Sequence, residues 1–197
     1  MPRRYTLGKR GEAQADTRRR IVDATLRLYR EVGIAGTTLA LVARAADVAP
    51  GTVRNHFPGP NDLAEAAADA ILESLAMPGE AIFAGADGPI ERLDRLLREL
   101  AAFFERSTGW WEVRVSDRGG TDSWAMPEAR YNARIEALIR RAIDPLGDDQ
   151  AVVAVVAAVL VSVYFAARTA VVSSDEAVAV ERALLVPWLA ARLEGRG

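Results

Sequence analysis

The fold of this chain is decided by residues 37–57, which read TTLALVARAADVAPGTVRNHF. Apolar residues recur at helical spacing from Leu39 to Ala46, which predicts a short helix with one apolar face. The pattern is interrupted at Asp47, and Pro50 lies where a second helix should begin, because the first helical position needs no backbone N–H. The stretch therefore predicts two short helices joined by a tight turn.

The second of these helices is expected to carry an apolar face and a polar one. Val53 and Phe57 are four residues apart and point in the same direction. The positions that lie mostly on its other faces are Thr52, Arg54, Asn55 and His56. Thr37 or Thr38 is expected to cap the first helix, because a hydroxyl there accepts from a free backbone N–H. Such a helix pair is typical of proteins that place the second helix in the major groove of DNA.

A longer pattern extends this stretch on both sides. The positions that carry it are Ile21, Ala24, Leu28, Tyr29, Gly33, Thr37, Thr38, Val42, Ala43, Ala46, Val48, Pro50, Gly51, Thr52, Val53, His56, Phe57 and Leu63. In these residues the segment 21–63, about a fifth of the chain, resembles the DNA-binding domain of TetR/AcrR-type transcriptional repressors. It departs from that family at Asp47 in place of a turn Gly, Ala49 in place of a Ser cap, Arg54 in place of Tyr and Pro60 in place of Lys.

The resemblance implies an all-α protein of two parts. We expect a basic flexible arm over residues 1–15, a three-helix DNA-binding domain over 16–60, and a helical effector-binding and dimerisation domain over 61–197. It also implies a ligand-responsive repressor that binds a palindromic operator as a homodimer and is released by a small-molecule effector. Two rivals stay open: an activator or architectural DNA-binding protein without a ligand, and a small helical enzyme that binds no nucleic acid.

The charge of the chain supports a nucleic-acid partner at the N-terminal end. Residues 1–60 hold eleven Arg and Lys against five Asp and Glu, whereas the remaining residues hold fourteen against twenty-two. A basic end on an acidic body indicates that one end meets a polyanion. The residues expected to contact DNA are Thr37, Thr38, Arg44, Thr52, Arg54, Asn55, His56, Arg18, Arg19 and Arg4.

Arg54 has two possible roles on DNA. Its planar fork matches O6 and N7 of guanine, which would make it a base-reading residue. It could instead hold a phosphate, since Pro60 removes the cation that the resembled family places at the start of the next helix. We expect the first role and keep the second as the alternative.

The composition excludes several kinds of chemistry. The chain has no cysteine and one histidine, and the lone lysine is Lys9, so thiolate chemistry, a His-rich metal site and a buried Schiff-base lysine are excluded. No Gly-rich phosphate loop is present, and no cofactor or metal is expected. No apolar run follows the basic N-terminal residues, so we expect a cytoplasmic protein.

The apolar run at residues 151–167 is expected to mediate dimerisation rather than to span a membrane. It contains a single polar residue, Ser162, is rich in Ala and Val and ends at Arg168. We expect this helix and the last one, from Ser174 to about Leu193, to form a homodimer interface. Its expected residues are Ala154, Ala158, Val161, Phe165, Leu185, Trp188 and Leu189.

Aromatic residues from several helices distinguish the C-terminal part. Most fit an ordinary core, and the resemblance adds an effector pocket among them. We expect an aromatic, uncharged or anionic effector, with Arg114 as a candidate counter-charge. The candidate pocket residues are Phe104, Trp110, Trp111, Arg114, Tyr131, Ser162, Phe165 and Arg168.

Overall fold

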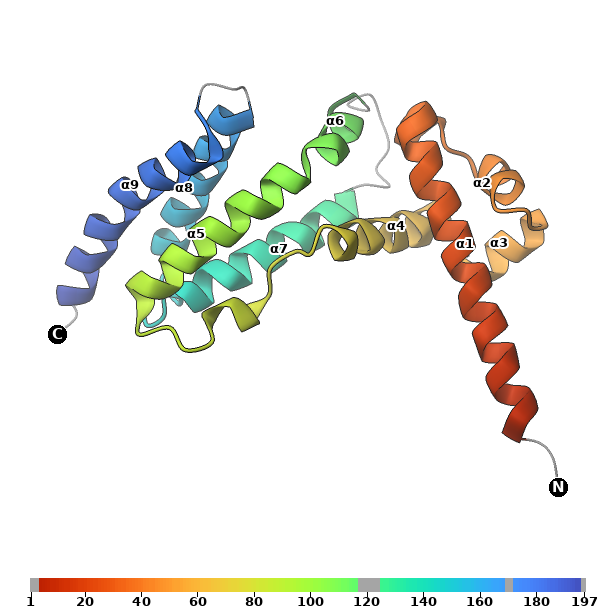
Figure 1. Ribbon diagram of the computed structural model, residues 1–197, viewed down its shortest axis with the longest axis horizontal. Coiled ribbons are helices and arrows are strands. Elements are labelled where there is room, and N and C mark those ends of the chain that lie inside the picture. Colours follow the sequence, from red (N-terminus) through yellow and green to blue (C-terminus); the bar gives the residue numbers. More distant parts are fainter. Residues whose placement is uncertain (1–3, 117–124, 169–171, 196–197) are drawn as a thin grey trace. The chain divides into compact units, whose positions relative to one another are not determined.

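The computed structural model describes residues 4–116, 125–168 and 172–195, and these ranges contain helices and no strands (Figure 1). The helices are α1 (Arg4–Gly36), α2 (Leu39–Ala45), α3 (Pro50–His56), α4 (Pro60–Ser74), the short 3₁₀ helix η1 (Glu80–Phe83), α5 (Pro89–Arg106), α6 (Thr108–Ser116), α7 (Ala125–Ala142), α8 (Gln150–Arg168) and α9 (Ser174–Glu194). The predicted all-α class is confirmed. The chain forms two compact units: unit 1 contains Met1–Glu73 and Gly109–Glu128, and unit 2 contains Ser74–Thr108 and Ala129–Gly197.

Unit 1 is held together by the apolar positions that the sequence pattern marks. Ile21 of α1, Val42 of α2, Val53 of α3 and Phe57 are each 0% exposed and belong to one core, which Leu63 of α4 completes. Helices as short as α2 and α3 are marginal in isolation, so their stability comes from this shared burial. The helix-turn-helix is therefore a product of packing as well as of local pattern.

Helix α1 is longer than the sequence analysis predicts. It begins at Arg4 rather than at Asp16 and therefore includes most of the segment expected to form a flexible arm. No proline follows Pro2 in this segment, and each residue added to an existing helix gains a hydrogen bond without a new nucleation cost. Near its other end Gly33 has φ 78° and ψ 169°, a left-handed φ that suits glycine and interrupts the helix.

Most of helix α6 belongs to unit 1. Trp110 and Val113 pack against a small core of Tyr29, Ile34 and Ala67. The Arg30 guanidinium lies over the Trp110 ring, 4.1 Å from its centroid. Pairing an aromatic face with an arginine in this way stabilises a half-buried tryptophan.

Unit 2 is a helical bundle in which α9 packs against α5 and α8 (Figure 1). Its core is formed by the apolar stripe of α5 together with α7, α8 and α9. Asp94 of α5 is 9% exposed and pairs with both Arg98 and Arg182, which ties α9 to α5. Helix α9 starts with a capping box between Ser173 and Glu176, and it continues through Pro187.

The apolar helix α8 is half covered by its own unit. Val152, Val153, Val156 and Leu160 are buried in the core, whereas Val161 is 54% exposed. Within the described ranges, no helix combines the length and the apolar character that crossing a bilayer requires.

Candidate functional site

The turn between α2 and α3 keeps its tight geometry despite the missing glycine. Thr38 is the N-cap of α2 and accepts a hydrogen bond from the Leu41 backbone N–H at 3.2 Å. The Thr37 hydroxyl instead donates to the Gly33 carbonyl at 2.7 Å. Asp47 takes φ 53°, the left-handed conformation that Asp tolerates better than most residues. Both threonines therefore position the helix pair.

One face of helix α3 carries polar side chains that are exposed or half-buried. Val53 beneath it is 0% exposed, whereas Arg54 and Asn55 are exposed and Thr52 and His56 are half-buried. Within the described part of the chain, the side chains of Arg54 and Asn55 take part in no hydrogen bond or ion pair. The planar fork of Arg54 and the amide of Asn55 are therefore free to bind an external partner.

Arginines of α1 are engaged at the ends of α2 and α3. The Arg18 guanidinium donates to the His56 carbonyl at 3.1 Å and lies over the Phe57 ring at 4.2 Å. Arg20 donates to the carbonyls of Ala46 at 2.6 Å and Asp47 at 3.1 Å. The last carbonyls of a helix have no partner within the helix and carry partial negative charge, which suits a cation.

These contacts give Arg18 and Arg20 a role inside unit 1 that the sequence does not show. Arg19 differs from them, because it forms an exposed ion pair with Asp16 at 2.5 Å. The side chain of Arg4 lies outside the described residues. Arg44 of α2 is exposed and, within the described residues, its side chain forms no hydrogen bond. DNA contact by these arginines stays a prediction.

The start of α4 carries an acid where the resembled family has a cation. The Gly59 backbone N–H donates to an oxygen of Asp62 at 2.8 Å, and Pro60 is the first helical residue. A carboxylate in this place satisfies a free N–H and suits the helix dipole. The anchor for phosphate that the family places here is therefore replaced by an internal cap.

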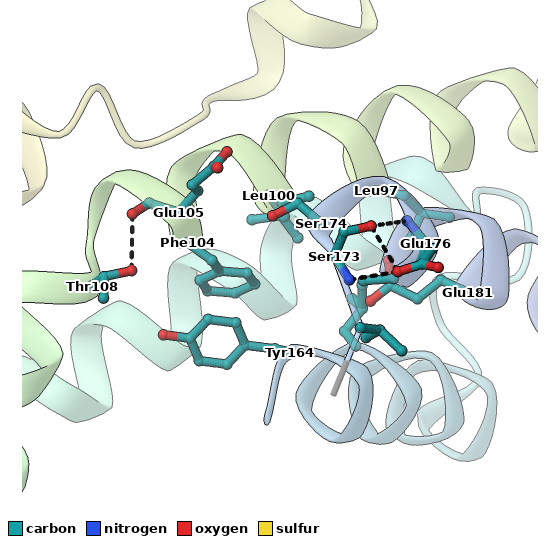
Figure 2. A pocket seen from close by; sticks show the side chains of 14 residues that line it. Leu97, Leu100, Phe104, Glu105, Thr108, Tyr164, Ser173, Ser174, Glu176 and Glu181 are labelled. Atoms are coloured by element: carbon teal, nitrogen blue, oxygen red, sulfur yellow. Dashed lines mark hydrogen bonds between the residues drawn. The ribbon is translucent and has the colours of Figure 1, made fainter. Parts of the chain in front are cut away.

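Unit 2 contains a cavity of about 620 Å³ between α5, α8 and the start of α9. Figure 2 shows the rings of Phe104 and Tyr164 side by side at one end of this cavity, with centroids 4.1 Å apart. The polar side chains at the other end come from Ser173, Glu176 and Glu181. The size and the mixed lining are typical of small-molecule sites.

Glu181 is the residue of this cavity that the sequence analysis missed. It is 5% exposed, and burial raises the pKa of its carboxyl group to about 8. It falls in the buried stripe of α9, four residues after Ala177 and four before Leu185. A glutamate inside an otherwise apolar helical stripe was the available signal.

Two other carboxylates line the cavity closer to solvent. Glu176 is exposed and forms the capping box, in which the Ser173 backbone N–H and then the Ser173 hydroxyl lower the pKa of the Glu176 carboxyl. Glu105 is also exposed, and its backbone carbonyl accepts from the Thr108 hydroxyl at 2.9 Å. No lysine, arginine or histidine is among the described residues that line the cavity.

Of the four predicted pocket residues whose side chains the structure describes, one lies at this cavity. Phe104 lines it, whereas Trp110 packs in unit 1 and Tyr131 stacks on Phe103 with centroids 6.2 Å apart. Ser162 is exposed on α8. The remaining four, whose side chains lie outside the described residues, are Trp111, Arg114, Phe165 and Arg168.

An exposed apolar face covers parts of α8 and α9. Val161 and Leu184 are 54% and 55% exposed, and the predicted interface residues Ala154 and Ala158 are exposed as well. Other exposed members are Val155 and Val180. Trp188 is half-buried, and the Arg192 guanidinium lies over its ring, 4.3 Å from the ring centroid.

The structure differs from the predicted interface at two leucines. Leu185 is 1% exposed and Leu189 is 0% exposed, because both belong to the core of unit 2. They have no surface left for a second subunit. The large apolar residues of α9 that are exposed in the described part of the chain are instead Val180 and Leu184. The side chain of Phe165, also predicted there, lies outside the described residues.

The described residues contain no group of three or more His, Cys, Asp or Glu that could hold a metal ion. His56, the single histidine, lies at the end of α3 in unit 1, and Glu181 lies in unit 2. Two regions of the described chain thus remain as candidate sites: the polar face of α3 in unit 1 and the acidic, aromatic cavity in unit 2.

Comparison with known proteins agrees with this division. Residues 21–67 match the family model described as "Bacterial regulatory proteins, tetR family". The HTH-type transcriptional regulator BetI of Burkholderia thailandensis is 39% identical over 77 residues, which are 39% of this chain and 40% of that protein. The matched segment thus spans less than half of these curated relatives.

Solved structures extend the likeness to both units. EbrR, a multidrug binding protein solved in complex with ethidium, is 26% identical with a TM-score of 0.61, covering 87% of this chain and 96% of that one. NalD, the secondary repressor of the MexAB-OprM multidrug efflux pump in Pseudomonas aeruginosa, shares the fold with a TM-score of 0.64 at 17% identity, covering 89% and 96%. Residues 21–67 of this chain thus match the helix-turn-helix domain of the tetR family of bacterial regulatory proteins, and its helical C-terminal part is similar in fold to these solved structures.

Proposed function

We propose that this chain is a ligand-responsive transcriptional repressor that binds a palindromic operator as a homodimer and leaves it when an effector occupies unit 2. The observation that carries the proposal is the polar face of α3. Arg54 and Asn55 are exposed and uncommitted on a helix that Val53 fixes in the core of unit 1. Positioned, unpaired donors on a short helix suit base edges in the major groove.

The exposed apolar face of α8 and α9 supports a homodimer. Exposed apolar side chains such as Val161, Val155 and Leu184 are costly in water and are covered when a second copy packs against them. Two copies related by a two-fold axis place two copies of α3 on one DNA duplex, which explains the expectation of a palindromic site.

The cavity supports control by a small molecule. It has the volume of a ligand site, and its aromatic and polar groups are within unit 2. The complex of EbrR with ethidium shows that a protein of this fold, 26% identical to this chain, accepts a small molecule. An effector that favours a body conformation with wrongly spaced α3 helices must weaken DNA binding by the same factor by which DNA weakens effector binding.

Helices α4 and α6 are the candidate connections between cavity and DNA. The chain passes from unit 1 to unit 2 at the end of α4, between Glu73 and Ser74. It passes back within α6: Thr108 lines the cavity, and Trp110, two residues later, packs in the core of unit 1. A displacement of Thr108 by a ligand would therefore act on the same helix that anchors Trp110.

The function is tested by selecting DNA from a random pool with the purified full chain and sequencing it. We expect enrichment of an inverted repeat, and its binding should be salt-dependent because phosphate contacts release counterions. Repression is then measured with a reporter gene behind the selected site. Failure to enrich any sequence would contradict the proposal, and increased reporter expression would favour the activator.

A further inference from the structure

Glu181 is a buried acid without a partner. Its side chain is 5% exposed, and it takes part in no hydrogen bond or ion pair within the described chain. Every enclosed side-chain nitrogen or oxygen in the described residues has a hydrogen-bond partner. The unpaired carboxyl oxygens of Glu181 must therefore be reached from the cavity that it lines.

Such a position costs free energy unless something compensates for it. A buried carboxylate is normally paired with a cation, or it is protonated instead. The neighbouring Arg182 is not that cation, because it pairs with Asp94, which also binds Arg98. The fold thus keeps a buried acid in a cavity and directs the adjacent arginine to another acid.

The rest of the cavity is also suited to positive charge. Glu105 and Glu176 line it together with Glu181, and no basic side chain is among its described lining residues. The rings of Phe104 and Tyr164 form an aromatic wall, as Figure 2 shows, and aromatic faces attract cations through their quadrupole. Leu97, Leu100 and Leu160 provide apolar lining.

From this arrangement we propose that the cavity of unit 2 binds a hydrophobic organic cation, with Glu181 as the counter-charge and Phe104 and Tyr164 as the aromatic wall. The inference rests on the proposed function only in naming this cavity as the effector site. It replaces the uncharged or anionic effector that the sequence analysis predicts. The side chain of Arg114, the expected counter-charge, lies outside the described residues, and the described lining is acidic.

The affinity of the cavity for a cation should depend on pH. Because burial raises the pKa of Glu181 to about 8, the carboxyl group is largely protonated at pH 7 in the free protein. A permanent cation favours the carboxylate, lowers this pKa and releases a proton on binding. Affinity should therefore rise with pH up to about 8 and level off above it.

The other charged groups around Glu181 are assigned as follows. Helix α5 contributes Asp94 and Arg98, which pair with each other, and the exposed Glu105. Helix α8 contributes the Tyr164 hydroxyl, and α9 itself contributes Arg182, which pairs with Asp94, and Glu176. The pKa of the Glu176 carboxyl is lowered by Ser173, so Glu176 stays ionised near neutral pH. Glu181 is the one buried acid without a pair among these described groups.

The direct test is calorimetric titration of the full chain with tetraphenylphosphonium and with tetraphenylborate, which have similar size and opposite charge. We expect the cation to bind with an affinity at least about tenfold higher than that of the anion. Titration in buffers of different ionisation enthalpy at pH 7 should show release of up to about one proton per cation bound. Ethidium, a flat cation, serves as a second probe.

Variants then locate the counter-charge. Glu181→Gln should weaken cation binding about tenfold at pH 9, change it little at pH 6, and abolish proton release. Glu99→Gln removes the same charge from an exposed position on α5 and should change nothing. Phe104→Leu removes one ring and should weaken the cation several-fold. Circular dichroism confirms that each variant is folded.

The results separate this inference from the proposed function, because calorimetry needs no DNA. Cation binding that depends on Glu181 without any effect on operator binding would support the inference and remove this cavity from the control of repression. Failure of both cations to bind, or equal binding of cation and anion by the wild-type chain, would overturn the inference and leave the repressor function standing.

Discussion

The arginines of α1 and the arginine of α3 have the same chemistry and different surroundings. Arg18 and Arg20 donate to the carbonyls that end α3 and α2, whereas Arg54 has no polar partner within the described chain. The first pair is therefore part of the structure of unit 1, and the third is available to an external ligand. The role of a charged side chain therefore depends on whether groups within the fold already form hydrogen bonds or ion pairs with it.

Unit 2 repeats this contrast with acids and with leucines. Asp94 pairs with Arg98 and Arg182, whereas Glu181 is buried without a pair. Leu185 is in the core, and its neighbour Leu184 is 55% exposed. In each pair the first residue is satisfied by contacts within unit 2. The second has a buried charge or an exposed apolar surface that a binding partner can cover.

The largest effect should come from the adjacent leucines. Leu185→Ala should lower the free energy of unfolding by about 2–5 kcal/mol, because it leaves a cavity in the core. Leu184→Ala should change protomer stability little, and Leu184→Glu should shift the protein toward monomers by placing a charge in the proposed interface.

Chemical denaturation and sedimentation velocity measure these two outcomes. An equal loss of stability in Leu185→Ala and Leu184→Ala would contradict the assignment of Leu185 to the core and of Leu184 to the surface. A wild-type chain that sediments only as a 21.3 kDa species at micromolar concentration would exclude the homodimer.

The second effect concerns Arg54 on DNA. Arg54→Ala should leave stability unchanged and weaken operator binding by roughly 1–3 kcal/mol, with relaxed preference at one position of each half-site if Arg54 reads guanine. If it holds a phosphate instead, the loss should be uniform over sequences, and the salt slope should fall by about one per subunit.

Binding to single-base operator variants at two salt concentrations distinguishes these roles. Deletion of residues 2–10, which carry four of the basic residues, provides the matched case for non-specific contact. It should weaken all sequences alike and flatten the salt dependence. An Arg54→Ala protein with unchanged affinity would defeat both assignments.

Arg20 should behave in the opposite way to Arg54. Arg20→Ala should lower the free energy of unfolding by about 1–2 kcal/mol, since it leaves the last carbonyls of α2 without their charged donor. Arg19→Ala removes only an exposed ion pair and should cost at most about 1 kcal/mol. Urea denaturation at fixed salt measures both. Equal costs would contradict a structural role for the Arg20 contact.

The last prediction concerns the stability contribution of Glu181, which should depend on pH. The pKa is raised in the folded state, so the folded protein binds the extra proton between the unfolded pKa near 4.5 and about 8, and stability falls as pH rises through this window. Glu181→Gln should therefore raise the free energy of unfolding by about 1 kcal/mol at pH 9 and leave it unchanged at pH 4, a value discounted because the cavity admits water. Thermal unfolding at both pH values measures this, and a benefit of the variant that is equal at both would contradict the assignment.

The sequence by itself determined the helix-turn-helix and most helix boundaries. These features depend on near neighbours: the Thr38 cap, the left-handed Asp47, Pro50 at a first helical position, and the apolar stripe of α5 over Pro89–Arg106. Local hydrogen bonds and helical periodicity act over three to four residues, so they can be read along the chain.

Only the tertiary structure decided which residues of one type are used and which stay free. Arg20 donates to the carbonyl of Ala46, 26 residues later in the chain, and Arg182 pairs with Asp94, 88 residues earlier. The two sides of the cavity are also far apart in sequence, so neither the exclusion of Trp110 from it nor the unpaired burial of Glu181 could be predicted from spacing. The physical reason is that solvation and charge pairing depend on which helices pack together, and periodicity within one helix carries no information about its neighbours.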